Sequence, residues 1–192
     1  MLRPIALCVL LAAGAAGCLV PLGIPATRVD GGYTSKGGGA LRVGTHVVGY
    51  RRDSSARWDL GAGYSLRTAT FDPMVPRASG VYAEASYLYR LDDHTRLSIG
   101  PGVDVMFRGS ADAIVPVAYA RLGVELYTPT LANVSSSDRC GVAAGTWFGQ
   151  AGLGAYVDVE TPVGEPGVAA VFGLSGRLPA FGGAAIVIPY CK

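Results

Sequence analysis

The sequence predicts an all-β fold, an antiparallel up-and-down barrel of about eight strands, and three observations support this prediction. Apolar and polar residues alternate along most of the chain after residue 38, as residues on the two faces of a strand do. The alternating segments run to about 10 to 14 residues, where transmembrane strands need about 9 to 11 and soluble strands average about 5 to 6. No stretch from residue 39 onward has the period of an amphipathic helix.

The clearest alternation lies in residues 96–108, RLSIGPGVDVMFR. One parity is apolar and includes Leu97, Ile99, Val103, Val105 and Phe107. The other parity carries charges and glycines, namely Arg96, Ser98, Gly100, Gly102, Asp104, Met106 and Arg108. A strand of this composition has one apolar face and one polar, glycine-rich face. Pro101 lies inside this strand and Pro116 inside the next, where each removes a donor from the sheet.

The same pattern defines the predicted strands in order, at residues 40–51, 57–70, 80–90, 96–108, 113–127, 141–160, 167–178 and 181–190. Representative apolar faces are Leu41, Val43 and Val47 in the first, Trp58, Leu60 and Leu66 in the second, Val81, Tyr87 and Tyr89 in the third, Leu122, Val124 and Leu126 in the fifth, and Leu153, Val157 and Val159 in the sixth. Runs rich in Asp, Ser, Pro and Gly separate the strands, and residues 128–139 form the longest predicted polar loop. Mostly short turns predict a meander in which each strand pairs with the next.

Residues 1–17, MLRPIALCVLLAAGAAG, read as an export signal. Arg3 supplies the positive n-region, and the apolar run that follows is too short for a stable transmembrane helix. The segment Ala15-Ala16-Gly17-Cys18 resembles the lipobox of bacterial lipoproteins. That resemblance implies a diacylglycerol and a palmitate on Cys18 as a covalent lipid, and Leu19 after the cysteine implies delivery to the outer membrane. The alternative is an ordinary signal-peptidase site near residues 13–15, with Cys18 incidental.

Residues 18–39 are predicted to be a lipidated N-terminus followed by a tether, because prolines and glycines interrupt any period there. Residues 40–192 then form the β-barrel domain. The segment 183–190, GAAIVIPY, resembles the C-terminal assembly signal of outer-membrane barrels, with Ile186, Ile188 and Tyr190 at the expected spacing and Pro189, Cys191 and Lys192 departing from it. The strand count resembles small barrels of the OmpA membrane-domain and OmpX type, which implies a barrel within a Gram-negative outer membrane. The alternative is a lipid-tethered soluble β-sandwich.

Charge composition favours the membrane. Of the 16 basic residues only Lys36 and Lys192 are lysines, although lysine is the default cation of a watery surface. The net charge of +2 does not indicate nucleic-acid binding. The predicted charge network of the lumen consists of Arg67, Glu84, Arg90, Arg96, Asp104, Arg108, Arg121 and Glu125. Because an eight-stranded barrel leaves room only for side chains or one small ligand, we expect a packed lumen rather than a charge-lined pore.

The remaining candidate sites are sparse. The two histidines, His46 and His94, form no metal-ligand pattern in the sequence, and no glycine loop leads into a helix, so neither metal nor nucleotide binding is expected. His94 and Ser98 are the nearest pair for an envelope lipid hydrolase, but they match no motif. Cys140 and Cys191 are candidates for a disulfide. In the predicted meander they lie at opposite rims, about 25 Å apart, so either they are free or the long sixth segment is divided near Gly149.

Together these features predict a non-enzymatic outer-membrane β-barrel lipoprotein without cofactor or metal. Its role would be structural or accessory, with contacts to membrane lipid and to partners of an envelope complex. The loop at residues 133–139 is the best candidate for a contact surface. The alternative is a periplasm-facing lipoprotein whose soluble sandwich binds a protein partner or a small ligand, and a lipid hydrolase is a third hypothesis.

Overall fold

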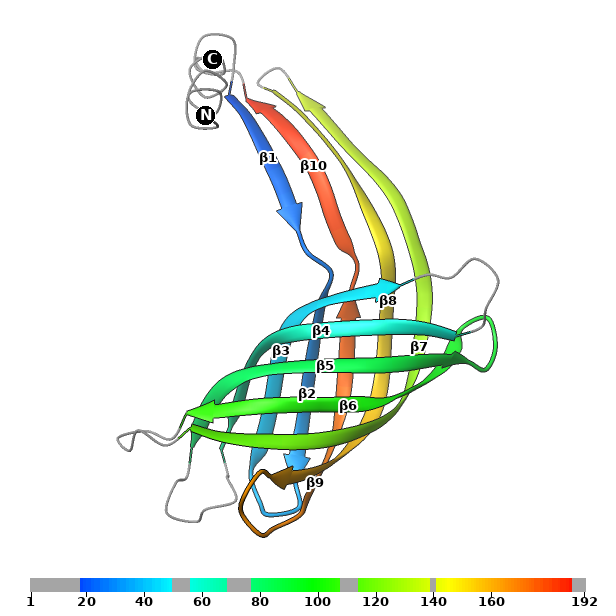
Figure 1. Ribbon diagram of the computed structural model, residues 1–192. Helices are drawn as coiled ribbons and strands as arrows, with labels where there is room; N and C mark the ends of the chain where they lie inside the picture. The colour runs from blue at the N-terminus through cyan, green and yellow to red at the C-terminus, as the bar shows by residue number, and fades with distance from the viewer. Residues whose placement is uncertain (1–17, 50–55, 69–76, 108–113, 139–140, 188–192) are drawn as a thin grey trace, which may run out of the picture. The chain divides into compact units, whose positions relative to one another are not determined.

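The computed structural model describes residues 18–49, 56–68, 77–107, 114–138 and 141–187. It contains ten strands and divides into two units (Figure 1). The larger comprises residues 26–129 and 150–178, and the smaller comprises residues 1–25, 130–149 and 179–192. In the described residues no helix is long and apolar enough to cross a membrane.

The larger unit is a closed antiparallel barrel of eight strands, which confirms the predicted fold class and excludes the sandwich. Seven pairings join sequence neighbours, and an eighth between β2 and β9, running from Thr27↔Leu178 to Thr34↔Val171, closes the barrel. The strands are β2 (Thr27–Thr34), β3 (Gly39–Gly49), β4 (Ala56–Arg67), β5 (Ala78–Arg90), β6 (Thr95–Phe107), the first part of β7 (Ile114–Asp138), the last part of β8 (Gly141–Pro162) and β9 (Ala169–Leu178).

The barrel begins earlier than the sequence pattern predicts. Residues 27–34, TRVDGGYT, were expected to belong to the tether, but they form β2 between β3 and β9. Arg28 and Asp30 are buried inside, whereas Val29 and Tyr33 face outward. The alternation is present, but Gly31 and Gly32 occupy two consecutive positions and hide it.

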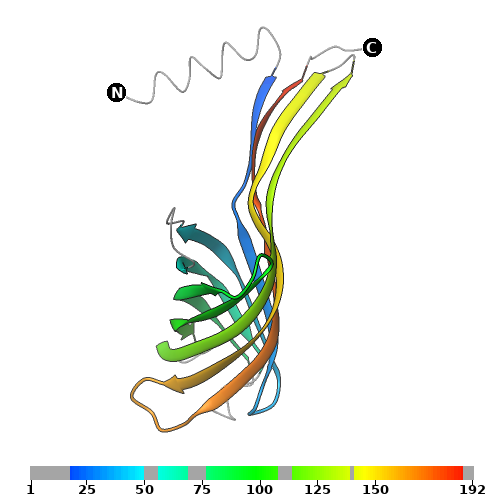
Figure 2. The same ribbon diagram turned by 90° about the vertical axis from the view of Figure 1, so that its right-hand side faces the viewer.

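The smaller unit is a four-stranded antiparallel sheet in the order β1-β10-β8-β7 (Figure 2). It contains β1 (Cys18–Ile24), β10 (Ala180–Val187), the start of β8 and the end of β7. Two predictions were wrong here. The last predicted strand belongs to this sheet rather than to the barrel, and residues 128–138 are not a loop but the continuation of β7. Thr146 of β8 donates a hydrogen bond to Asn133 of β7 at 2.9 Å, so polar side chains that suggest a loop instead bond across a strand pair.

Each of the four places where the chain passes between the units carries a residue that disturbs a β-ladder. Pro25, Pro129 and Pro179 supply no backbone donor, and Gly149 has a φ of 114°, in the left-handed region that favours glycine. The expected division of the sixth segment near Gly149 therefore exists as a boundary between units within one continuous strand. Pro101 and Pro116 interrupt nothing and remain in register with Ala120 and Val105 respectively.

Candidate functional site: an ion-paired lumen

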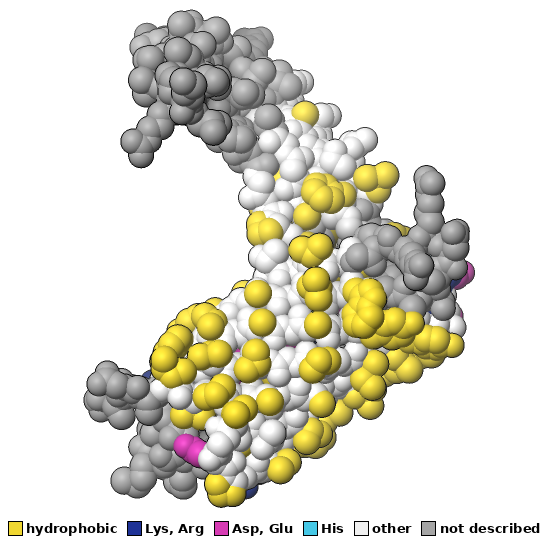
Figure 3. All heavy atoms as spheres, viewed as in Figure 1, with side chains coloured by type: hydrophobic (Ala, Val, Ile, Leu, Met, Phe, Trp, Pro, Cys, Tyr) yellow, Lys and Arg dark blue, Asp and Glu magenta, His cyan; other side chains and the backbone are white. Residues whose placement is uncertain are grey.

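The barrel is polar inside and apolar outside. Large apolar side chains on every barrel strand face outward, and Figure 3 shows them covering the visible outer face of the barrel with very few charged groups among them. They include Val29, Val47, Trp58, Leu60, Val81, Ile99, Leu122, Val124, Leu153, Val159, Phe172 and Leu174. The opposite parity of each strand points into the lumen, as period-two alternation requires.

Among the described residues, six arginines and seven carboxylates are buried in this lumen. They are Arg28, Arg42, Arg67, Arg96, Arg121 and Arg177 with Asp30, Asp59, Glu84, Asp104, Glu125, Asp158 and Glu160. All seven carboxylates are at most 7% exposed, and Asp59, Asp104, Asp158 and Glu160 are fully buried. Buried charges are tolerated in proteins when they are paired and hydrogen-bonded, and every one of these groups has an opposite charge beside it.

One end of the network is built around Asp104 and Glu160. Arg42 Nη2 lies 2.8 Å from Asp104 Oδ2 and 2.9 Å from Glu160 Oε1. Arg67 Nη2 lies 2.6 Å from Asp104 Oδ2, and its Nη1 lies 2.5 Å from Glu160 Oε2. These four residues come from β3, β4, β6 and β8, so the cluster ties non-adjacent strands together across the lumen.

The middle of the network links β2, β5, β7 and β8 through two arginines. Arg121 donates to Asp30 at 2.6 Å and to Asp158 at 2.8 Å, while Arg28 donates to Glu84 at 2.6 Å. Asp158 also accepts from Arg42 at 2.5 Å, which connects this cluster to the one around Asp104. Arg28 and Asp30 of β2 thus belong to the lumenal charge network, although the network predicted from the sequence did not include them.

The other end of the network contains Arg96, Arg177, Glu125 and Asp59. Arg177 lies 2.5 Å from Asp59 and 3.0 Å from Glu125, and Arg96 lies 2.8 Å from Glu125. Arg96 also donates to the side chain of Gln150. Every described strand of the barrel therefore contributes at least one charged group to the lumen.

Tyrosine rings pack against the guanidinium planes. Tyr119 lies 4.1 Å from Arg42, Tyr156 lies 4.2 Å from Arg121, and Tyr127 lies 4.6 Å from Arg96, measured from ring centroid to Cζ. The Tyr119 hydroxyl also donates to Glu84 at 3.1 Å. A guanidinium over an aromatic face is attracted by the ring quadrupole, so these rings stabilise the arginines while they fill the lumen.

Glycines on the inner parity make room for these large groups. A Cβ at Gly102 would lie 2.1 Å from Cζ of Tyr119, and a Cβ at Gly61 would lie 2.1 Å from Cε1 of His46. Neither distance is compatible with a side chain at the glycine. The glycines on the polar parity of the strands therefore leave the space in the lumen that the arginine, tyrosine and histidine side chains occupy.

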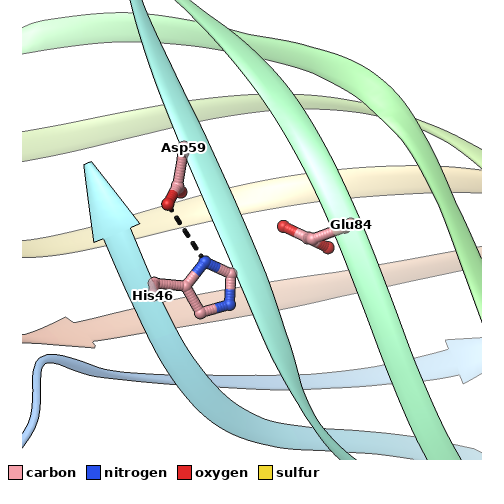
Figure 4. A group of neighbouring side chains, drawn as sticks. All are labelled: His46, Asp59 and Glu84. Carbon is pink, nitrogen blue, oxygen red and sulfur yellow. Dashed lines mark hydrogen bonds and ion pairs between the residues drawn. The ribbon is translucent and has the colours of Figure 1, made fainter. Parts of the chain in front are cut away.

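His46, Asp59 and Glu84 come together at one point of the lumen, with possible ligand atoms within 4.8 Å of one another (Figure 4). The sequence predicts no metal-ligand pattern for the histidines, because these three residues come from three separate strands, β3, β4 and β5, and meet only in the fold. His46 Nδ1 is 3.2 Å from Asp59, and Nε2 is 3.1 Å from the Tyr82 hydroxyl. Asp59 is paired with Arg177 and Glu84 with Arg28, so positive charge already faces this point.

Of the eight predicted lumenal residues, six lie in the lumen: Arg67, Glu84, Arg96, Asp104, Arg121 and Glu125. Arg90 does not, because the end of β5 leaves its side chain 43% exposed and paired with Asp93 in the β5–β6 turn. Arg108 is outside the described residues. The pattern missed Arg28, Asp30, Arg42, His46, Asp59, Asp158, Glu160 and Arg177, although the parity of each strand assigns all of them to the inner face.

The other predicted sites fall differently. Cys18 is the first residue of β1, and its lipidation stays a prediction. Residues 1–17, Cys140 and Cys191 are outside the described residues. Val187 pairs with Cys18 on one side and with Gly141 on the other, so the start of β8 and the end of β10 lie at the same end of one sheet. The predicted meander instead placed these two strand ends at opposite rims. His94 lies in an exposed turn whereas Ser98 is buried in the lumen, which separates the pair proposed for a hydrolase.

No protein-family model matches the chain, and no curated protein sequence matches it. Two solved structures are similar to it. One comes from the de novo design of transmembrane β-barrels, at 11% identity over 81% of this chain and 98% of that chain, with a TM-score of 0.38. The other is the outer membrane protein Ail of Yersinia pestis in a phospholipid bilayer nanodisc, at 10% identity over 81% of this chain and 100% of that chain, with a TM-score of 0.36. Both likenesses are distant and concern the strand arrangement alone.

Proposed function

We propose that this chain is a non-enzymatic β-barrel lipoprotein of a Gram-negative outer membrane, with a structural or accessory role in the cell envelope. The observation that carries the proposal is the inverted polarity of the barrel. Outward side chains such as Leu60 and Ile99 are each 56% exposed, whereas Asp104 and Glu160 are fully buried. A continuous apolar surface around a soluble protein would drive association, but around a barrel in a bilayer it is the surface that lipid requires.

The outward aromatics support the same orientation. Trp58 and Tyr89 lie toward one rim, while Phe107 lies near the other, opposite Ser79. Tyr89 and Ser79 are ten residues apart on β5. At about 3.3 Å per residue and a tilt of about 40°, this separation spans roughly 25 Å along the barrel axis, which is the height of the apolar band of outer-membrane barrels between its two aromatic girdles.

The lumen supports a structural role rather than transport. Salt bridges cross it in three clusters, which are linked by Arg42 with Asp158 at 2.5 Å and by Arg28 with Asp59 at 3.7 Å. Tyrosine rings fill the space between them. A passing solute would have to break several buried ion pairs, each of which costs several kcal/mol, about 3 to 5, when one partner is removed. The barrel is thus a rigid membrane anchor in this proposal, and its polar side chains are committed to one another.

Partner contacts belong to the smaller unit in this proposal. Its described residues carry a single charged residue, Asp138, and residues 131–137 are exposed. Leu131 is 82% exposed. A photo-cross-linking residue at position 131 should form a discrete protein adduct in cells, whereas one at Leu153, which is 72% exposed on the outer face of the barrel, should react with lipid.

The membrane barrel is tested by electrophoresis of the full chain purified in detergent. An intact barrel resists dodecyl sulfate at room temperature, so the unboiled protein should migrate differently from the boiled protein. Identical migration, together with solubility of the Cys18→Ala variant without detergent, would contradict the proposal. Palmitate labelling that disappears in Cys18→Ala supports the lipid anchor, and unchanged labelling removes it.

A further inference from the structure

A cavity of about 590 Å³ opens near one rim of the barrel, where β3 and β5 begin and β4 and β6 end. Its apolar lining includes Leu41, Tyr64, Leu66 and Phe107, each between 40% and 49% exposed. The volume lies within the range of about 300 to 1,000 Å³ that is usual for small-molecule sites.

The strand register explains why the surface is hollow at this place. Leu41 pairs with Leu66, Leu66 with Ser79, and Ser79 with Phe107, so these four residues form one row across β3, β4, β5 and β6. Because Ser79 is small, it leaves a gap between Leu66 and Phe107. Thr68 fixes the edge of the cavity, since its hydroxyl accepts a hydrogen bond from Gly39 N at 2.7 Å.

Arg77 adds positive charge to the rim end of the cavity, whereas the charge of a second arginine there, Arg67, is matched by Asp104 and Glu160. Arg77, directly before β5, lines it, is exposed, and forms no ion pair with any other described residue. Arg67 also lines it from the lumen side, and its Nε–H, though buried, has no hydrogen-bond partner among the described groups. An arginine fork matches phosphate geometry, and a buried donor without a partner is costly.

We propose that this cavity binds a lipid with a phosphate headgroup, placing the phosphate near Arg77 and an acyl chain along Leu41, Leu66 and Phe107. The inference rests on the proposed function, because such a lipid reaches the site only if the outer face of the barrel lies in a bilayer. Two features select this ligand. The cavity is continuous with the outward apolar face, and its charge is at the rim, where lipid phosphates lie.

The same phosphate chemistry occurs in glycerophospholipids and in lipid A, so both are used as probes. The full chain in detergent micelles is titrated with phosphatidylglycerol, with lipid A and with zwitterionic phosphatidylcholine, and bound lipid is counted by native mass spectrometry. Ser79→Leu fills the gap without changing any charge, and Arg77→Gln removes the cation. Lys36→Gln is the matched control, because it removes an exposed charge from the same rim outside the cavity.

The wild-type protein and Lys36→Gln should bind one phosphatidylglycerol, one lipid A, or either, in preference to phosphatidylcholine. Ser79→Leu and Arg77→Gln should each weaken this binding at least roughly tenfold, the factor that corresponds to about 1.4 kcal/mol. Equal binding by wild type and Ser79→Leu, or no preference for the anionic lipids, would overturn the inference. If the same samples still show heat-dependent migration, the membrane barrel stands and only the lipid site is lost. If they do not, the proposed function has failed.

Discussion

Removal of the Asp104 carboxylate should destabilise the barrel strongly. Asp104 Oδ2 accepts from Arg42 Nη2 at 2.8 Å, from Arg42 Nε at 3.2 Å and from Arg67 Nη2 at 2.6 Å, and the residue is fully buried. In Asp104→Ala the two guanidiniums keep Glu160, and Arg42 also keeps Asp158, but one of the two carboxylates that both guanidiniums share is lost. Breaking a buried pair on one side costs about 3 to 5 kcal/mol, so we expect a loss of about 4 kcal/mol.

Urea unfolding from lipid vesicles, followed by tryptophan fluorescence, measures this loss as a shift of the midpoint at unchanged slope. Asp93→Asn is the control, because that carboxylate is 80% exposed and pairs with Arg90 in a turn. Exposed pairs contribute about 0 to 1 kcal/mol, so the control should unfold close to wild type. If Asp104→Ala also unfolded within about 1 kcal/mol of wild type, the lumenal network would not be the source of stability.

Two further predictions follow from the packing and from the turns. Gly102→Ala would place a Cβ 2.1 Å from the Tyr119 ring, so the ring must move away from Arg42 and Glu84, at a cost of about 1 to 3 kcal/mol that the same urea assay detects. Gly31→Ala serves as its control, since a Cβ at Gly31 would have nothing within 4 Å and the backbone there is not in the left-handed region. Asp92, in the exposed β5–β6 turn, accepts hydrogen bonds from the backbone of His94 and Thr95, which hold its pKa below the usual 3.8. Because the folded pKa is lowered, this turn contact is present above the unfolded pKa and is lost as the pH falls through the folded value. The amide signals of His94 and Thr95 should therefore titrate together below pH 3.8, and a midpoint at or above 3.8 would contradict the hydrogen bonds.

The barrel class was predictable because period-two alternation is a direct record of its two faces. Of the clearest segment, residues 96–108, the described part up to residue 107 lies in β6, with Arg96 and Asp104 inside and Ile99 and Phe107 outside, as its parity requires. The first barrel strand was not predictable in the same way, because Gly31 and Gly32 contribute no polarity contrast. Arg28 and Asp30 flank Val29 and are the signal that could have revealed it.

The division into two units was only partly visible in the sequence. Gly149 indicated a division of the sixth predicted segment. The position of residues 180–187 could not be predicted, because it depends on pairing with strands that are distant in sequence. β10 pairs with β1 and β8, whereas β9 pairs with β2. Arg90 illustrates a different limit, since its parity is correct but β5 ends there and the side chain bonds to the turn instead of entering the lumen.

The central claim, that the outer face of the barrel contacts lipid, is tested most directly at Trp58. This indole faces outward from β4, is 59% exposed and packs edge-on against Tyr87 at 5.3 Å. In a Trp147→Phe variant, which leaves Trp58 as the single tryptophan, fluorescence should be quenched by lipids brominated close to the headgroup and protected from aqueous acrylamide. Efficient quenching by acrylamide with no effect of the brominated lipids would show that this face contacts water, and the membrane barrel would be refuted.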